Sequence, residues 1–247
     1  MTAQFRAELL KLRSTRTNLG LFSALLGFVL FVVLLHGFSL PVEHISRRSD
    51  QLHVVFGWAA LLGSLFAALL GALAITDEFR HGTIRPTFLV TPQRGRVVVA
   101  KVWASMLIGS VFGLIAAAVA IGVGSAALAT RGLEIRLGGG DYALLLVGCA
   151  AAAALWAAIG VGLGAVVRNQ VPTVVGICAW LLFIESLLLG DVGLVGDVGR
   201  FTPGALGKAA SGQDPLLAPG LAVFLLALYT AAAVAAGWVA TTRRDVV

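Results

Sequence analysis

The chain has 247 residues, of which 59% are apolar and only 12% are charged. Ordinary soluble domains are about 45–50% apolar and about 25% charged. The composition therefore excludes a soluble enzyme, a nucleic-acid-binding domain and a disordered chain, and it indicates a protein whose solvent is lipid. The net charge of +6 has to be interpreted by its distribution along the chain.

Six continuously apolar stretches are long enough for a transmembrane helix, which needs about 20 residues. Transmembrane strands would instead alternate apolar and polar residues over about 10 positions. We therefore predict an all-α, polytopic protein whose residues 1–247 form a single transmembrane domain. The predicted spans are Leu19–Phe38, Val54–Ile75, Val102–Ala129, Tyr142–Val167, Pro172–Gly190 and Gly220–Ala240.

The basic residues are distributed unequally between the two sides that these spans define. One side, which holds both termini, has twelve Lys or Arg and four acidic residues, whereas the other has six basic and seven acidic residues. Because Lys and Arg are enriched in cytoplasmic loops, we expect both termini in the cytoplasm. Richness in Ala, Gly and Val, with Arg preferred over Lys, indicates a bacterium with a GC-rich genome, and hence its inner membrane.

The sequence offers no groups for catalysis or metal binding. Cys149 and Cys178 both fall inside predicted spans, where small apolar core residues are expected. The fragment from Gly204 to Lys208 lacks the spacing and the hydroxyl of a phosphate-binding loop. We therefore expect no enzyme activity and no directly bound cofactor or metal. If ATP drives the protein, another chain must bind it.

The residues before the first span, 1–18, form a predicted amphipathic helix. Phe5, Leu9 and Leu12 follow the helical spacing and share one face, while basic residues occupy other directions. Such a helix is expected to lie along the inner membrane surface. Its basic residues are interpreted either as a simple membrane anchor or as contacts for a partner.

The segment 76–101, between spans two and three, is expected to face the cytoplasm. Gly82 is expected to break the helix that continues span two. Thr83 is a plausible N-cap for a short helix, which Thr91 and Pro92 would end. The exposed Phe88 of that helix would be unfavourable in water without a partner or lipid.

This segment, from Glu78 to Pro92 and on to Lys101, resembles the membrane subunits of ABC type-two exporters. The resemblance implies six spans, an amino-terminal elbow helix and a cytoplasmic coupling helix. It also implies a second permease subunit and two copies of a cytosolic ATPase that binds ATP and Mg²⁺. By position, the residues implied at the joint with the ATPase are Asp77, Glu78, Phe79, Arg80, Gly82, Thr83, Phe88 and Arg94.

Three further features lie inside the predicted spans or in the loop on the outer side of the membrane. Glu185 is the one acid within a predicted span, so it is a candidate for the substrate path, with a water-accessible interface residue as the alternative. Two G-x-x-x-G patterns, starting at Gly109 and Gly160, predict close helix packing within one subunit. Residues 191–219 are expected to form an outer loop, with a re-entrant or interfacial helical hairpin as one possibility.

The favoured function is thus an ATP-driven exporter subunit for a hydrophobic or amphipathic substrate such as a drug, lipid or peptide. A stand-alone secondary transporter would be favoured by ionisable residues in several spans, and here there is essentially one. A non-transporting membrane scaffold or sensor is the third interpretation.

Overall fold

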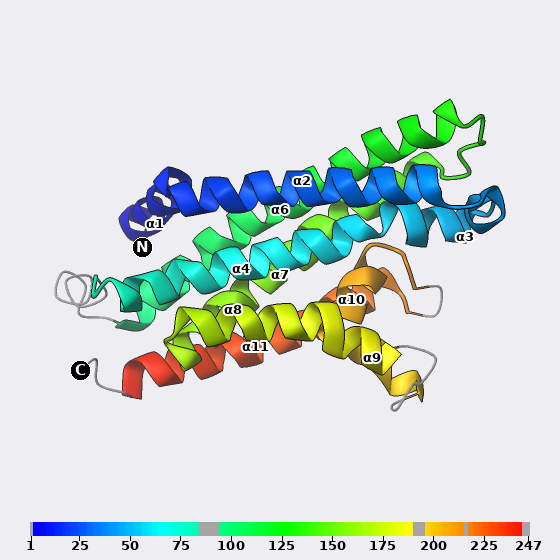
Figure 1. The fold of residues 1–247 in the computed structure, drawn as a ribbon. Coiled ribbons are helices and arrows are strands. Elements are labelled where there is room, and N and C mark those ends of the chain that lie inside the picture. The colour runs from blue at the N-terminus through cyan, green and yellow to red at the C-terminus, as the bar shows by residue number, and fades with distance from the viewer. Residues whose placement is uncertain (1, 84–93, 190–195, 215–216, 244–247) are drawn as a thin grey trace.

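The structure is a computed structural model that describes residues 2–83, 94–189, 196–214 and 217–243. Every regular element in these ranges is a helix, as predicted. The long helices run side by side along one axis (Figure 1). Six helical segments are long and apolar enough to cross a membrane: Arg16–Ser39, Arg48–Arg80, Gly95–Thr130, Gly139–Val167, Gln170–Leu187 and Pro219–Arg243.

The elements follow one another as up-and-down helices with shorter pieces between them. From the amino terminus these are α1 (Thr2–Ser14), α2 (Arg16–Ser39), η1 (Val42–Ile45), α3 (Arg48–Asp50), η2 (Gln51–Phe56), α4 (Trp58–Arg80) and α6 (Arg94–Thr130). The carboxyl-terminal half contains α7 (Gly139–Val167), α8 (Gln170–Ala179), η3 (Trp180–Ile184), α9 (Glu185–Leu189), η4 (Gly196–Phe201), α10 (Pro203–Ala210) and α11 (Pro219–Arg243).

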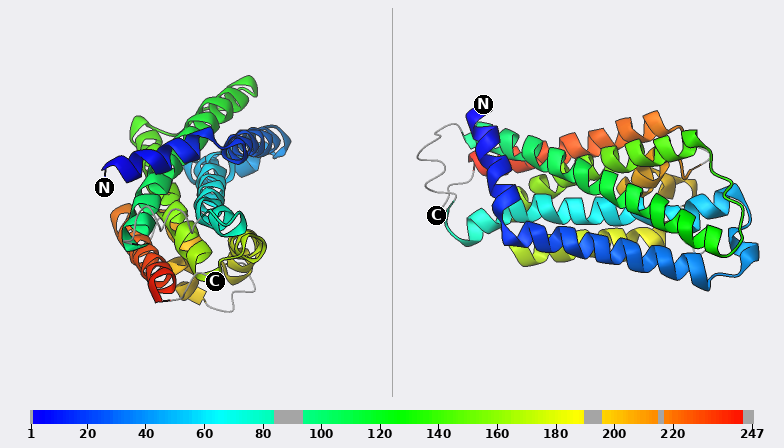
Figure 2. Two further views of the ribbon diagram at one scale, coloured as in Figure 1. Left: turned by 90° about the vertical axis from the view of Figure 1, so that its left-hand side faces the viewer. Right: turned by 90° about the horizontal axis from the view of Figure 1, so that it is seen from above.

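The bundle has two distinct ends. The amino terminus, the end of α4, the start of α6 and the carboxyl end of α11 lie at one end, which we call the α1 end (Figure 1). The opposite end, called the α3 end, carries α3 and the α6–α7 connection. Helix α1 crosses the α1 end at a steep angle to the other helices (Figure 2).

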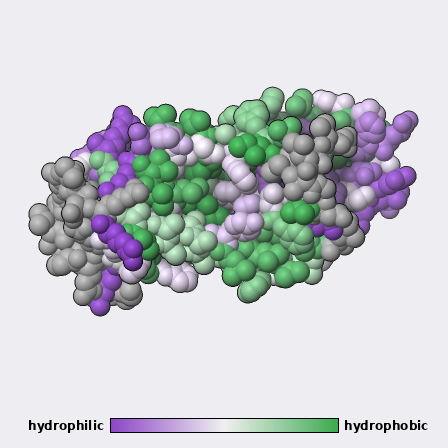
Figure 3. Space-filling view, turned by 90° about the horizontal axis from the view of Figure 1, so that it is seen from below, coloured by the Kyte–Doolittle hydropathy of each residue, from purple (hydrophilic) through white to green (hydrophobic). Residues whose placement is uncertain are grey.

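Apolar side chains cover the middle of the bundle. In a view from below, green apolar residues lie between hydrophilic residues at the two ends (Figure 3). Large apolar side chains such as Phe31 of α2 and Phe183 of η3 are 62% and 70% exposed. A soluble protein would not leave so many of them in water, so this surface is suited to lipid.

Helices α4 and α7 form the centre of the bundle. In the most apolar window of the segment that contains α4, 83% of the residues are buried, compared with 17% in α2. Both helices have glycines where a neighbouring backbone comes close. A Cβ added at Gly71 would lie 1.9 Å from the carbonyl oxygen of Ala157, and one at Gly160 would lie 2.1 Å from that of Ala68. Only a hydrogen fits at these positions.

The same close packing joins α7 to its other neighbours. A Cβ at Gly113 of α6 would lie 2.2 Å from the carbonyl oxygen of Cys149, and one at Gly162 would lie 2.4 Å from that of Ala233 in α11. The two G-x-x-x-G patterns therefore pack helices within one subunit, which confirms that prediction.

Candidate functional site

The residues implied at the ATPase joint begin in the last turn of α4. Asp77 and Phe79 are half-buried, Glu78 is buried, and Arg80 is exposed. Helix α4 ends at Arg80, and Gly82 has a positive φ of 66° in an exposed turn, so the predicted helix break is confirmed. The remaining predicted residues are Thr83, which is exposed, Phe88, which lies outside the described residues, and Arg94, the first residue of α6.

Four charged side chains from three helices meet beside this turn, and we call them the charge cluster. They are Glu8 and Lys11 of α1, Glu78 of α4 and Lys101 of α6. Lys101 donates to Glu8 over 2.5 Å and to Glu78 over 3.0 Å. Lys11 donates to the same two carboxylates over 2.9 and 3.0 Å. The cluster thereby ties α1 to α4 and α6.

Three of the four side chains of the charge cluster are buried, and only Lys11 is exposed. Glu8 is 3% and Lys101 is 2% exposed. Burial disfavours the charged carboxylate of Glu8, but Lys101 and Lys11 outweigh that effect and hold its pKa below the ordinary value. Burial also opposes the charge of Lys11, yet its bonds to Glu8 and Glu78 raise its pKa. The charges of Glu8 and Lys11 are therefore sustained by their partners.

Glu78 bonds within its own chain, while its implied contact with an ATPase stays a prediction. The resemblance suggested that its charge would be available to an ATPase. In the structure its side chain is buried, and its Oε1 accepts hydrogen bonds from both lysines of the same chain. Its carboxylate therefore joins helices within the subunit. Sequence reasoning had placed Lys101 at the end of the segment that carries the resemblance and Lys11 among the basic residues of the first helix, but it did not predict the pairing between the helices.

A second junction lies at the same end, between α4 and the α7–α8 turn. Arg80 donates to the Oε1 of Gln170 over 2.8 Å. Arg168 has a left-handed backbone (φ 57°), places its guanidinium 5.4 Å from the centre of the Phe79 ring, and donates to the carbonyl oxygen of Ala240 over 2.7 Å. This turn therefore fastens the ends of α4 and α11.

The predicted apolar face of α1 packs against the bundle. Leu12 is buried, and Phe5 and Leu9 are partly buried against the same hydrophobic cluster. The three residues therefore share one face, as expected. Leu10, which points elsewhere, is 67% exposed. Packing on α2 and α6 thus accounts for the apolar face of this helix.

Glu185 lies at the start of α9, near the α3 end. It is 3% exposed, which differs from the water-accessible alternative. Its Oε1 accepts hydrogen bonds from the backbone N–H groups of Gly204 and Ala205, over 2.8 and 2.9 Å, and from the hydroxyl of Thr202. A carboxylate is favourable at the amino terminus of α10, where backbone donors are unpaired. Glu185 therefore fastens α10 to the fifth membrane-crossing segment.

Part of the predicted outer loop is helical. Helix α10 packs its buried Leu206, Ala209 and Ala210 into a hydrophobic cluster with α7 and α11. Residues 190–195, where the loop begins, lie outside the described residues.

Comparison with known proteins gives one match. A model of the ABC-2 family transporter proteins matches residues 31–196. This range includes α4, α6 and α7, and with them Glu78 and Lys101 of the charge cluster and the pair Arg80–Gln170, whereas α1 and α11 lie outside it. No match was found among curated proteins. Since the matched range covers more than half of the chain, the protein belongs to the ABC-2 transporter family, whose members are multi-pass membrane permease components.

Proposed function

We propose that this chain is the permease subunit of an ATP-driven exporter in a bacterial inner membrane. Two permease subunits combine with two copies of a separate cytosolic ATPase, which binds ATP and Mg²⁺. The complex moves a hydrophobic or amphipathic molecule, such as a drug, lipid or peptide, outward. Family membership supports the permease assignment, since ABC-2 permeases normally work with an ATPase subunit.

The α1 end is proposed to face the cytoplasm. This end holds α1, the end of α4, the start of α6, Arg168 and the end of α11. Twelve of the 18 basic residues belong to this side of the sequence. The positive-inside rule therefore supports cytoplasmic termini. In this orientation α1 takes the place of the elbow helix, and segment 76–101 that of the coupling segment.

The charge cluster is the observation that carries the coupling mechanism. The connection between α4 and α6 leaves α4 shortly after Glu78 and enters α6 shortly before Lys101. These two side chains are bonded to each other and to α1. A displacement of the connection by the ATPase would therefore act on α1, α4 and α6 together, rather than on one helix alone.

Site-specific photo-crosslinking tests the proposed contact. A benzoylphenylalanine at His81, in the exposed turn after α4, is expected to form an adduct with the ATPase in the assembled complex. The matched control is the same replacement at His44, an exposed histidine of η1 at the α3 end. An adduct from position 44, or none from position 81 in a complex that hydrolyses ATP, would contradict the proposal.

The coupling role is tested separately by the ATPase rate of the complex in lipid nanodiscs. We expect Lys101→Met to bring this rate towards that of the isolated ATPase, because the three helices no longer move as one. Lys101→Arg keeps the charge and serves as the control. A Lys101→Met complex with unchanged rate and unchanged transport would contradict a coupling role for the cluster.

A further inference from the structure

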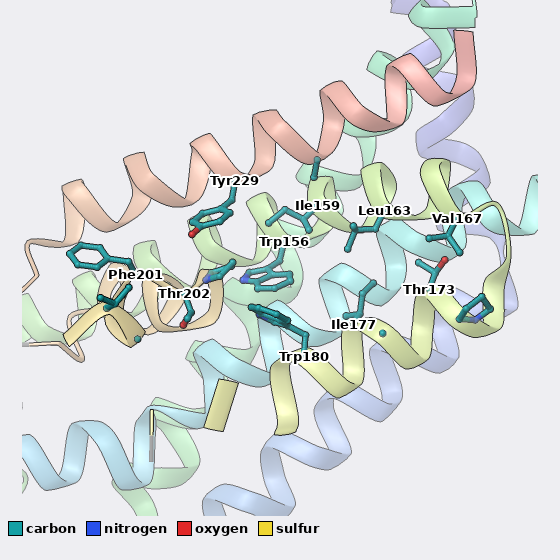
Figure 4. Close-up of a pocket in the computed structure, with 16 residues that line it drawn as sticks. Trp156, Ile159, Leu163, Val167, Thr173, Ile177, Trp180, Phe201, Thr202 and Tyr229 are labelled. Carbon is teal, nitrogen blue, oxygen red and sulfur yellow. The ribbon is translucent and has the colours of Figure 1, made fainter. Parts of the chain in front are cut away.

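A long cavity of about 610 Å³ lies between α7, α8, η3, η4, α10 and α11. Figure 4 shows its arrangement, with Trp156 of α7 and Trp180 of η3 in the middle. Phe201, Thr202 and Tyr229 lie towards one end of this row, and Val167 and Thr173 lie towards the other. The volume lies within the range of about 300–1,000 Å³ that is typical of small-molecule sites.

The lining of this cavity is neutral and mostly apolar. Among the described residues that form it, none is charged. The hydroxyl groups of Thr173 and Thr202 are already engaged, the first with the carbonyl oxygen of Asn169 and the second with Glu185. An ionised occupant would therefore have no opposite charge beside it, and the lining is suited to an uncharged molecule.

Two buried hydrogen-bond donors in the lining have no partner in the described part of the chain, and the hydroxyl of the half-exposed Tyr229 is a further donor of the lining. The indole nitrogens of Trp156 and Trp180 are both buried, and neither has an acceptor among the described residues. Trp156 as a whole is 3% exposed. A buried donor without a partner costs about 1–3 kcal/mol, so such groups in a native structure need an explanation. A molecule in the cavity that carries an acceptor would provide one.

The backbone around Trp180 is unusual as well. Helix α8 ends at Ala179, and Trp180–Ile184 form a π-helical segment before α9 begins. Single π-helical turns within α-helices are frequent at functional sites. Here the turn carries one of the two indoles that line the cavity.

The chemistry of the lining separates the candidate occupants. A hydrocarbon chain alone leaves both indole donors unpaired. A buried water that accepted from an indole would need two to four polar partners, and the unpaired hydroxyl near the Trp156 indole, that of Ser64, lies outside the cavity lining. A helix of a second subunit has its backbone carbonyls already bonded internally. A neutral molecule with an apolar body and a carbonyl or ether oxygen fits all of these constraints.

We propose that this cavity is a binding site for an uncharged, membrane-soluble molecule that carries a hydrogen-bond acceptor, which the indoles of Trp156 and Trp180 recognise. The proposal deepens the proposed function, because it names a ligand class for the permease and in that sense rests on it. Binding is measured on the full chain without an ATPase or nucleotide. Failure of the site and failure of ATP coupling are therefore distinguishable.

Photolabelling of the chain in lipid nanodiscs tests the site. The probe is benzophenone, which has an apolar body, one carbonyl oxygen and its own photochemistry. Mass spectrometry is expected to find adducts on the cavity-lining parts of α7, α8 and η3. Two competitors at equal bilayer concentration test recognition of the oxygen. Phenyl benzoate carries an ester carbonyl and is expected to suppress labelling at about tenfold lower concentration than diphenylmethane, which has none.

Matched variants assign this preference to the indoles. Trp156→Phe with Trp180→Phe keeps two aromatic rings and removes both donors, so the preference for phenyl benzoate should disappear. Trp103→Phe, at a 60% exposed tryptophan of α6 outside the cavity, should retain it.

A filling variant tests the cavity independently of the tryptophans. Gly176 lines the cavity, and a Cβ there would meet no atom within 4 Å. Gly176→Leu is expected to abolish labelling at the cavity. Gly122→Leu, at an equally open glycine of α6, should leave it unchanged. Full labelling of the Gly176→Leu variant, or equal suppression by the two competitors in the wild-type chain, would overturn the proposal.

Discussion

The two ends of the bundle are fastened by different chemistry. At the α1 end, three buried charges (Glu8, Glu78 and Lys101) and the half-exposed Lys11 join α1, α4 and α6. At the α3 end, the buried side chain of Gln51 joins the carbonyl oxygens of Ile45 and Glu134 and the N–H of Arg136 through neutral bonds. Two ion pairs at that end, Arg48 with Asp141 and Arg136 with Glu134, are largely exposed on the arginine side.

This difference indicates how each end would respond to a displacement of its helices. Each neutral hydrogen bond in a buried site can be lost separately, at its own cost in free energy. Buried ion pairs depend on one another, because the removal of one partner leaves an uncompensated charge. The α1 end therefore behaves as a single unit that either holds or separates. The α3 end is held by several independent bonds.

The largest effect is expected from loss of the central cation. Lys101→Met removes the buried cation that Glu8 and Glu78 share and leaves them the half-exposed Lys11, and breaking a buried ion pair in this way costs about 3–5 kcal/mol. Unfolding in mixed detergent should show this loss. The triple variant Lys101→Met, Glu8→Gln, Glu78→Gln also removes the two carboxylate charges and should regain part of this stability. If it is no more stable than Lys101→Met, the uncompensated charges do not cause the loss.

A smaller effect is expected from pH, because burial partly offsets the ion pairs. The pKa of Glu8 is lowered, so its stabilisation is complete above the ordinary carboxyl pKa of about 4 and is lost as the pH falls through the lowered value. The pKa of Lys11 is raised, so its stabilisation is complete below about pH 10 and is lost as the pH rises through the raised value.

Hydrogen exchange of α1 amides, corrected for the intrinsic rate, measures this window. Protection should be greatest between the two limits. In Lys11→Met the loss of protection at high pH should disappear, while the loss at low pH remains through the bond between Glu8 and Lys101. If Lys11→Met loses protection at high pH as the wild type does, that loss is caused by the titration of another group.

The smallest effect is expected at the α3 end. Arg48→Gln removes an ion pair whose arginine is exposed to solvent, and such pairs contribute little because water and salt screen them. Detergent unfolding of this variant should coincide with that of the wild type. A clear destabilisation would remove the contrast between the two ends.

Much of the architecture was predictable from sequence because lipid imposes a simple length rule. Six apolar runs gave six helices, although the structure extends the second from Val54 back to Arg48 through α3 and η2. The turn at Gly82 and the shared face of Phe5, Leu9 and Leu12 were also predictable, since both depend on neighbours in sequence.

The contacts of the site were not predictable in the same way. Lys101 is 23 residues from Glu78 and 93 from Glu8, and no local pattern relates the three. A lysine between apolar residues at the start of a span was the available signal. Glu185 was singled out correctly as unusual, but its immediate partners are backbone groups of α10, which leave no mark in sequence. Its proposed place in a substrate path stays a prediction.

The glycine contacts along α7 restrict how such a protein can move. Where Gly160 meets Ala68 and Gly71 meets Ala157, only hydrogen separates one backbone from the other. Rotation of α7 by a single residue would drive a methyl group or larger side chain into that space. We therefore expect α4 and α7 to move as one rigid unit, so that any displacement of α4 would carry α7 with it.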